Sequence, residues 1–316
     1  MDSLSLPKPL TPYSRLRLFL ALSRTPHAMM DMATPGLAAL LFLDGFPPLG
    51  VTLIGLVTVF AGYTSVYALN DLMDYPTDRI KVQESKFAGR QGYLDSAIVG
   101  HPLARGLLGF RESLSWVIAW AVLALLGACL LHPICALIFL GGCALEAVYC
   151  LLWRVSYLRA IVSGAVKTSG AMAAVFAVDS APPPAFLMVL FLWVFFWEIG
   201  AQHIPADWAE IEEDRRLDGK TIPVRFGPQR ASQVILAFLV AAVLMSTLVL
   251  WVAPLRATAA HTVIFVAVGV ALLLHPAYRL YRRRDPARVA ALFNRASYYP
   301  LALLIVVAMS LLFSAP

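Results

Sequence analysis

Residues 49–78 read LGVTLIGLVTVFAGYTSVYALNDLMDYPTD, an apolar run that ends in the acidic motif Asn70-Asp71-x-x-Asp74-x-x-x-Asp78. The run is long enough to cross a bilayer as a helix, which takes about 17–25 residues. Carboxylates next to such a run are costly and are rarely kept without a function. Because a helix turns about 100° per residue, the four motif side chains would lie within about 100° of one another. Pro76 predicts that this helix kinks or ends near Tyr75.

A second acidic motif follows another apolar run, residues 185–203. It reads Asp207-x-x-Glu210-x-x-x-Asp214-x-x-x-Asp218. On one continuous helix these four side chains would share a narrow face. Two carboxylate faces at the ends of membrane helices suit a hard divalent cation, and Mg²⁺ in particular is usually shared with substrate phosphates. The two motifs therefore predict a metal-dependent site for a phosphorylated substrate.

The composition of the 316-residue chain is that of a multi-pass membrane protein. Of the residues, 60% are hydrophobic and only 14% are charged, and the mean hydropathy is +0.75. A soluble domain has about 25% charged residues. We expect an all-α polytopic membrane protein with nine transmembrane helices around a central cavity that opens to the cytoplasmic side. The expected spans are residues 27–43, 50–69, 114–131, 134–151, 158–178, 185–203, 231–252, 259–277 and 297–314.

The distribution of basic residues predicts the orientation of the chain. The net charge is +6, and 23 of the 25 lysines and arginines fall in the N-terminal stretch or in the loops after the even-numbered spans. Arg256 lies in an opposite loop, and Lys167 lies within the fifth span. Basic loops remain in the cytoplasm, so we expect an integral protein of the inner or cell membrane with a cytoplasmic N-terminus. The basic charge thus reflects topology and contact with membrane lipid, and it gives no support for a nucleic-acid partner.

The same charge pattern divides the chain into functional parts. We expect residues 1–26 to form a cytoplasmic tail and residues 27–316 to form a single transmembrane domain. Two long cytoplasmic loops, about residues 71–113 and 204–230, each begin at an acidic motif, and function concentrates in such irregular segments. The recurrence of the motifs suggests two related halves of a bundle that face one shared cavity.

These residues resemble the UbiA superfamily of intramembrane prenyltransferases. Its first signature, NDxxDxxxD at the end of the second helix, is matched by Asn70, Asp71, Asp74 and Asp78. Its second is an Asp-rich run after the sixth helix that leads into Thr-Leu-Pro-Val and Gly, matched here by DWAEIEEDRRLDGKTIPVRFG, residues 207–227. One departure concerns the Arg-Pro-Leu that usually follows the first motif after about ten residues. Here His101-Pro102-Leu103 stands in its place, after an insertion, Gln83–Gly100, which we expect to affect acceptor choice together with His101.

The resemblance implies transfer of a prenyl group from a polyprenyl diphosphate to a small-molecule acceptor, with Mg²⁺ as cofactor. Asp74 and Asp214 would be catalytic. The implied metal site comprises Asn70, Asp71, Asp74, Asp78, Asp207, Glu210, Asp214 and Asp218. Candidate diphosphate-binding residues are Arg79, Lys81, Lys167, Arg215 and Lys220, although Lys167 is equally well explained by a structural pair with Glu146 or Glu198. Candidate acceptor-binding residues are Arg24, His101, Tyr149 and His203, and for His203 we favour the role of a hydrogen-bonded neighbour of Asp207.

Several alternatives remain at this point. The resemblance favours an aromatic, quinone-precursor-like acceptor, but a phospho-sugar, a glycerol phosphate or a tetrapyrrole would also be consistent with it. A cation-coupled transporter would also place carboxylates in a membrane bundle, although transport sites lie nearer the bilayer midplane. A CDP-alcohol phosphatidyltransferase would need one contiguous motif and about six helices, which does not fit two distant motifs and nine expected spans.

Overall fold

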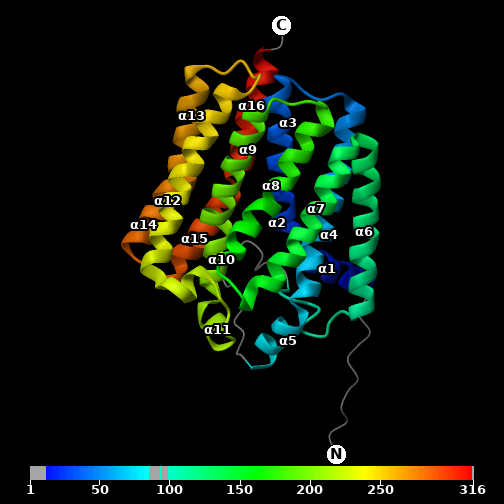
Figure 1. Ribbon diagram of the computed structural model, residues 1–316, viewed down its shortest axis with the longest axis vertical. Coiled ribbons are helices and arrows are strands. Elements are labelled where there is room, and N and C mark those ends of the chain that lie inside the picture. The colour runs from blue at the N-terminus through cyan, green and yellow to red at the C-terminus, as the bar shows by residue number, and fades with distance from the viewer. Residues whose placement is uncertain (1–11, 85–92, 94–98, 315–316) are drawn as a thin grey trace, which may run out of the picture.

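The computed structural model describes residues 12–84, 93 and 99–314, and this part of the chain contains helices, turns and loops but no strand. Figure 1 shows the long helices running side by side in one bundle. The short helices α5 (Tyr75–Glu84) and α11 (Ile211–Arg216) lie together at one end of it, and the C-terminal helix α16 (Tyr299–Ser314) ends at the other.

Within the described residues, eight helical stretches are long and apolar enough to cross a membrane. This confirms the expected all-α, multi-pass architecture. In order, they are α4 (Leu49–Met73); α6 (Phe110–Leu131); α7 (Pro133–Leu151) with η2 (Leu152–Arg154); α8 (Arg159–Val178); α9 (Pro184–Trp197) with η3 (Glu198–His203) and α10 (Ile204–Ala209); α12 (Ile222–Val252); α13 (Ala259–Gly269) with η4 (Val270–Leu274) and α14 (His275–Arg282); and α15 (Pro286–Ser297) with α16.

The first of the nine expected spans, residues 27–43, is helical but broken. It forms α2 (Thr25–Asp31) and α3 (Ala33–Leu43), which meet at Met32 and are each too short to span alone. Pro35 has no N–H to donate to the carbonyl of Asp31, four residues earlier, so a regular helix cannot continue through this point. The short α2 carries His27 and Asp31, and α3 is its apolar continuation.

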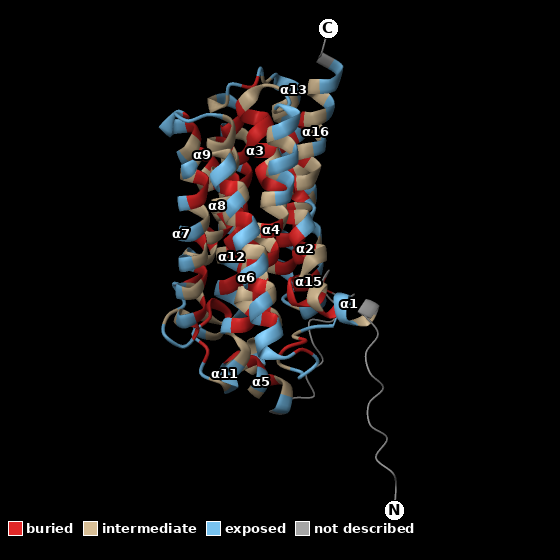
Figure 2. Cartoon of the chain, turned by 90° about the vertical axis from the view of Figure 1, so that its right-hand side faces the viewer, coloured by how far each residue is buried: buried red, intermediate tan, exposed pale blue. Residues whose placement is uncertain are grey.

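The outer surface of the bundle is apolar, as a lipid-facing surface requires. In α4, only 17% of the residues in its most apolar stretch are buried inside the protein, and the same fraction holds for α6. On α6 and α7 the side chains of Leu126, Leu130 and Leu137 are 58%, 75% and 68% exposed. Figure 2 shows exposed residues along the outward faces of the helices, while buried residues lie between the helices.

The segments next to the acidic motifs are less continuous than the sequence suggested. As expected from Pro76, α4 ends at Met73, and α5 begins at Tyr75. The prediction of one helix through residues 207–218 was wrong, because α10 ends at Ala209 and Glu210 has non-helical angles (φ −110°, ψ 17°). Asp218 lies beyond α11 with φ 59°, a left-handed conformation. The four acids of the second motif therefore do not share a helical face.

Two other expected loops also contain regular structure. Residues 12–22 of the expected tail form α1 (Pro12–Leu22), whose Leu18 and Leu22 pack in one apolar cluster with Ala68 and Leu72 of α4. The expected loop 204–230 is largely helical, since α10, α11 and the first turns of α12 occupy it. The insertion Gln83–Gly100 lies largely outside the described residues. Within it, the hydroxyl group of Tyr93 donates a hydrogen bond to the carbonyl of Pro205 (3.1 Å).

Candidate active site

A cavity of about 560 Å³ extends into the bundle from the end that holds both acidic motifs. The expectation that both motifs face one cavity agrees with its lining, although not every acid takes part. Asp71 is buried behind the wall, and Asp218 is exposed and does not line the cavity. The motif residues that line the cavity are Asn70, Asp74 and Asp78 from the first motif and Asp207, Glu210 and Asp214 from the second.

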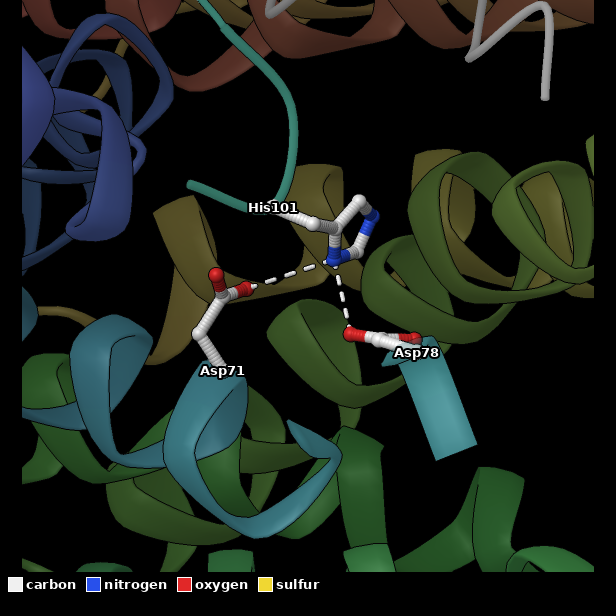
Figure 3. Close-up of side chains that lie close together, drawn as sticks. All are labelled: Asp71, Asp78 and His101. Carbon is white, nitrogen blue, oxygen red and sulfur yellow. Dashed lines mark ion pairs between the residues drawn. The ribbon is translucent and has the colours of Figure 1, made fainter. Parts of the chain in front are cut away.

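Cationic side chains from distant parts of the chain contact the first motif. Arg24 lies at the start of α2 with φ 45°, and its guanidinium donates to Oδ1 of Asn70 and to Oδ1 of Asp71, both at 3.3 Å. Nδ1 of His101 lies 2.7 Å from Oδ2 of Asp78 and 3.8 Å from Oδ1 of Asp71 (Figure 3). The fold thus brings Asp71, Asp78 and His101 together. One potential ligand atom from each of these three residues lies within 4.8 Å of the other two, a spacing that could hold a metal ion.

His101 lies at the cavity wall in contact with the first motif, and its expected role in acceptor binding stays a prediction. The loop before α6 folds back and places the imidazole between two carboxylates of the first motif. Burial lowers the pKa of His101, but the carboxylate of Asp78 outweighs this and the pKa rises to about 9. At neutral pH the imidazole is therefore charged, and it supplies the positive charge that the Arg of the Arg-Pro-Leu pattern would provide.

Lys81 of α5 links the two motifs. Its ammonium group lies 2.7 Å from Oε2 of Glu210 and 3.0 Å from Oδ1 of Asp214. Burial lowers the pKa of Lys81, but the two carboxylates outweigh it and the pKa is raised above its usual value. On the other side of the second motif, His203 lies 3.2 Å from Oδ2 of Asp207, one turn along the helix, as expected for a hydrogen-bonded neighbour.

Two carboxylates of the site, those of Asp74 and Asp214, have raised pKa values. Burial and the neighbouring carboxylate of Asp78 raise the pKa of Asp74 to about 7, and no ion pair joins Asp74 to a described lysine, arginine or histidine. Burial also raises the pKa of Asp214 to about 7, although Lys81 lowers it in part. Buried carboxylate oxygens that lie close together are a fitting donor set for Mg²⁺, which prefers hard oxygen ligands. The residues present therefore fit the implied metal.

Two further residues line the cavity beside Asn70 and Asp74: Glu146, which the sequence analysis named only as a possible partner of Lys167, and Arg159, which it did not identify. Glu146 of α7 accepts a hydrogen bond from Nδ2 of Asn70 (2.8 Å), which orients that amide. Arg159 of α8 is 5% exposed, and its guanidinium lies 4.0 Å from the centre of the Tyr149 ring. No ion pair joins Arg159 to a described carboxylate, and its Nε has no hydrogen-bond partner. Its position at the start of an apolar span was the signal that could have identified it.

Of the other candidate diphosphate-binding residues, three lie away from the cavity wall and one, Lys167, lies on it. Arg79, Arg215 and Lys220 are exposed and are not among the lining residues, and Arg215 instead contacts Glu212 (3.0 Å) on the surface of α11. Lys167 does line the cavity, but its ammonium group contacts Asp31 (2.5 Å) and Glu198 (3.6 Å). Of the two structural partners expected for Lys167, Glu146 and Glu198, the structure shows the ion pair with Glu198. The closer partner, Asp31, was not anticipated.

A helical membrane bundle whose two carboxylate motifs face an internal cavity defines a class of membrane-embedded enzymes that act on phosphorylated, partly apolar substrates. The chain belongs to the UbiA prenyltransferase family, whose family model matches residues 32–314. It is accordingly a prenyltransferase, as the resemblance implied, and the transporter alternative is not supported. Comparison with curated protein sequences gave no match.

Solved structures share the fold of this chain over nearly its full length. A UbiA homologue from Aeropyrum pernix K1 has a TM-score of 0.71 and 21% identity, and the match covers 90% of this chain and 98% of that one. A UbiA homologue from Archaeoglobus fulgidus bound to GPP and Mg²⁺ has a TM-score of 0.66 and 19% identity, with 92% and 99% covered. A structure of digeranylgeranylglyceryl phosphate synthase has a TM-score of 0.66 and 14% identity, with 95% and 99% covered.

Proposed function

We propose that this protein transfers a prenyl group from a polyprenyl diphosphate to a small-molecule acceptor within the membrane, and that the reaction depends on Mg²⁺. The observation that carries the proposal is the single cavity lined by carboxylates of both motifs. The homologue from Archaeoglobus fulgidus, which was solved with GPP and Mg²⁺, supports it. An allylic diphosphate has an anionic head and an apolar tail, and the cavity offers matching surfaces to both.

The carboxylates that line the cavity would hold the metal. When bound, Mg²⁺ would neutralise the charge that develops on the diphosphate leaving group. Asp71 would act by holding Arg24 and His101 in place, since it contacts both from behind the cavity wall. Asp218 is removed from the proposed metal ligands because it is exposed and lies outside the cavity. The proposed ligands are Asn70, Asp74, Asp78, Asp207, Glu210 and Asp214.

Cationic residues of the cavity would bind the phosphate oxygens of the donor. Arg159 supports this role most directly, because its guanidinium is buried on the cavity wall and forms no direct ion pair with a described carboxylate, although the charges of Asp207 and Asp74 act on it from a greater distance. Arginine also presents a planar fork of donors that suits phosphate. Arg24 and Lys81 line the same cavity and would reach the diphosphate from two other sides. Arg79, Arg215 and Lys220 are not proposed for this role.

The apolar part of the cavity would bind the prenyl tail. Its wall along α4 is formed by Val51, Leu56 and Val59, which precede the polar end of the same helix. An apolar surround keeps water away from the allylic carbon while the bond to the diphosphate breaks. Tyr149, which lies between Arg159 and His203, would present an aromatic face near the site of bond breaking. Such a face can stabilise a cation.

The acceptor that the resemblance favours is aromatic and similar to a quinone precursor. The likeness to digeranylgeranylglyceryl phosphate synthase supports a second candidate, a glycerol phosphate acceptor. We further propose that the motif end of the bundle faces the cytoplasm, as the distribution of basic residues indicates. The acceptor would then enter from the cytoplasm, and the donor from the membrane lipid.

One assay tests these proposals together. The purified protein is incubated with radiolabelled dimethylallyl, geranyl or longer prenyl diphosphates, with Mg²⁺, and with aromatic or glycerol phosphate acceptors. We expect labelled, prenylated acceptor only when Mg²⁺ is present. Transfer at full rate in excess EDTA would overturn the metal-dependent mechanism.

A further inference from the structure

A second group of charged side chains lies in the cavity, apart from the two acidic motifs. The ammonium group of Lys167 on α8 lies 2.5 Å from Oδ2 of Asp31 on α2 and 3.6 Å from Oε2 of Glu198 on η3. The hydroxyl group of Tyr67 on α4 donates to Asp31 and lies 3.0 Å from Nζ of Lys167. We call Asp31, Tyr67, Lys167 and Glu198 the Lys167 cluster. It places two carboxylates against one ammonium group in the interior of the bundle.

The Lys167 cluster lies between the proposed diphosphate site and the apolar part of the cavity. The cavity-lining residues of α4 change along the helix from Val51 and Val59 through Tyr67 to Asn70 and Asp74. Tyr67 precedes Asn70 by three residues, which corresponds to about 4.5 Å along a helix axis. The cluster is thus about one turn deeper than the first motif. The reactive carbon of a prenyl diphosphate, which joins the anionic head to the apolar tail, belongs at this level.

Several buried polar atoms near the cluster have no hydrogen-bond partner. They are Oε2 of Glu198, Oε1 of Gln202 and the hydroxyl oxygen of Tyr63, and all three residues line the cavity. Glu198 and Gln202 are only 7% and 3% exposed. The other carboxylate oxygen of Glu198, Oε1, accepts a hydrogen bond from Ser163 (3.0 Å), which fixes its orientation. Oε2 of Glu198 has the ion pair with Lys167 at 3.6 Å, which is longer than a hydrogen bond. Because buried polar atoms normally have a hydrogen-bond partner, these acceptors on a cavity wall point to a ligand that donates hydrogen bonds.

The chemistry of the ligand follows from these atoms. The carboxylate of Glu198 and the amide oxygen of Gln202 can only accept hydrogen bonds. An anionic group would also meet the second carboxylate, Asp31, whose described ion-pair partners are the ammonium group of Lys167 and, at 3.8 Å, the imidazole of His27. A hydroxyl group on an otherwise uncharged head satisfies both conditions, since it donates a hydrogen bond and brings no negative charge.

We propose that the Lys167 cluster is the part of the acceptor site that binds a hydroxyl group of the acceptor, with Oε2 of Glu198 as the atom that receives the hydrogen bond. This inference rests on the proposed prenyl transfer and names the acceptor class for it: a hydroxyl-bearing head that is uncharged where it meets the cluster. Glu198 and Lys167 select the acceptor, and the acidic motifs bind the donor. The two halves of the reaction therefore depend on different residues and can be tested separately.

The test uses the full-length protein in lipid nanodiscs with Mg²⁺ and geranyl S-thiolodiphosphate, a donor analogue that does not react. Binding of hydroquinone and of its dimethyl ether, 1,4-dimethoxybenzene, is measured by isothermal titration calorimetry. The two probes share a ring but only hydroquinone donates hydrogen bonds. We expect hydroquinone to bind about tenfold more tightly, because a hydrogen bond to a charged acceptor contributes that much affinity. In Glu198→Gln the preference should fall to about threefold or less.

Two further variants keep the result interpretable. Ser163→Ala removes only the hydrogen bond to Glu198 and should give an intermediate preference if Glu198→Gln is poorly folded. Asp179→Asn changes an exposed carboxylate at the far end of α8 and should bind both probes as the wild type does. Equal binding of the two probes to the wild type, or an unchanged preference in both Glu198→Gln and Ser163→Ala, would overturn the inference. Affinity for geranyl S-thiolodiphosphate should be normal in all three variants, whereas failure of the proposed function itself would appear as loss of this binding in the wild type.

Discussion

The ammonium group of Lys81 lies 3.0 Å from Oδ1 of Asp214, although 133 positions separate the two residues in the chain. Lys81 belongs to α5, the helix that begins within the first motif and contains Asp78, and Asp214 belongs to the second motif. This contact joins the two motifs across the mouth of the cavity. Burial raises the pKa of Asp214, and Lys81 from the other motif lowers it in part.

The first prediction concerns the metal. Asp74→Asn and Asp214→Asn should each lower turnover by about 10²-fold or more, because each removes a charged ligand from the site that stabilises the leaving group. Excess EDTA should have the same effect on the wild type. Prenyl transfer to an acceptor is the measurement, with Glu212→Gln as control, since the side chain of Glu212 is 70% exposed on α11. Asparagine variants with normal turnover would show that these carboxylates do not hold the metal.

The second prediction concerns Lys81. Lys81→Met should weaken binding of geranyl S-thiolodiphosphate by about tenfold, since one charge-assisted contact to phosphate is lost. It should also lower the thermal unfolding temperature, because Glu210 and Asp214 then lose their ammonium partner. Calorimetry and thermal unfolding measure the two effects. Arg79→Met, an exposed change two residues earlier on α5, should alter neither quantity, and equal effects of the two variants would contradict the assignment.

The third prediction concerns Arg159. Arg159→Gln should weaken donor-analogue binding by about 10- to 100-fold, because the guanidinium is buried on the cavity wall, forms no direct ion pair with a described carboxylate and can donate to phosphate oxygens. Arg159→Lys should recover only part of the affinity, since an ammonium group cannot bind two oxygens in a planar fork. Arg154→Gln is the matched control, because Arg154 is exposed and lies five residues earlier. Unchanged affinity in Arg159→Gln would exclude Arg159 from the diphosphate site.

The fourth prediction separates two roles for His101. If its positive charge balances Asp71 and Asp78, His101→Arg should keep metal-dependent donor binding, and His101→Leu should reduce it by about tenfold. Neither variant should change the preference for hydroquinone over its dimethyl ether. A changed acceptor preference with normal donor binding would support the acceptor-binding role expected from the sequence.

The fifth prediction concerns orientation. In a variant without the four native cysteines, a single cysteine at Asp218 should react with a membrane-impermeant maleimide only from the cytoplasmic side. A cysteine at Ala181, between α8 and α9, should react only from the opposite side. Both positions are exposed, so each is accessible to the reagent. Labelling of both from the same side would contradict the orientation inferred from the basic residues.

The sequence alone determined the helical membrane architecture and the two acidic motifs. Lengths of apolar runs are local properties, and lipid requires every spanning segment to satisfy its own backbone hydrogen bonds. The break after Met73 was equally predictable, since Pro76 acts on its own neighbours. The expected count of nine spans is close to the eight found among the described residues for the same reason. The difference is the first expected span, which is divided into two short helices near Pro35.

Tertiary structure alone decided which charged side chains meet in the cavity. Asp218 lies outside the cavity, beyond the end of α11, and helix-face arithmetic could not anticipate this because that arithmetic assumes a continuous helix. Lys81, Arg159 and the pair of Asp31 with Lys167 depend on contacts between helices that are distant in the chain. The sequence shows that a buried charge needs a partner, but the packing of the helices selects that partner, because a charge in the bundle interior is stabilised only by groups within a few ångströms of it.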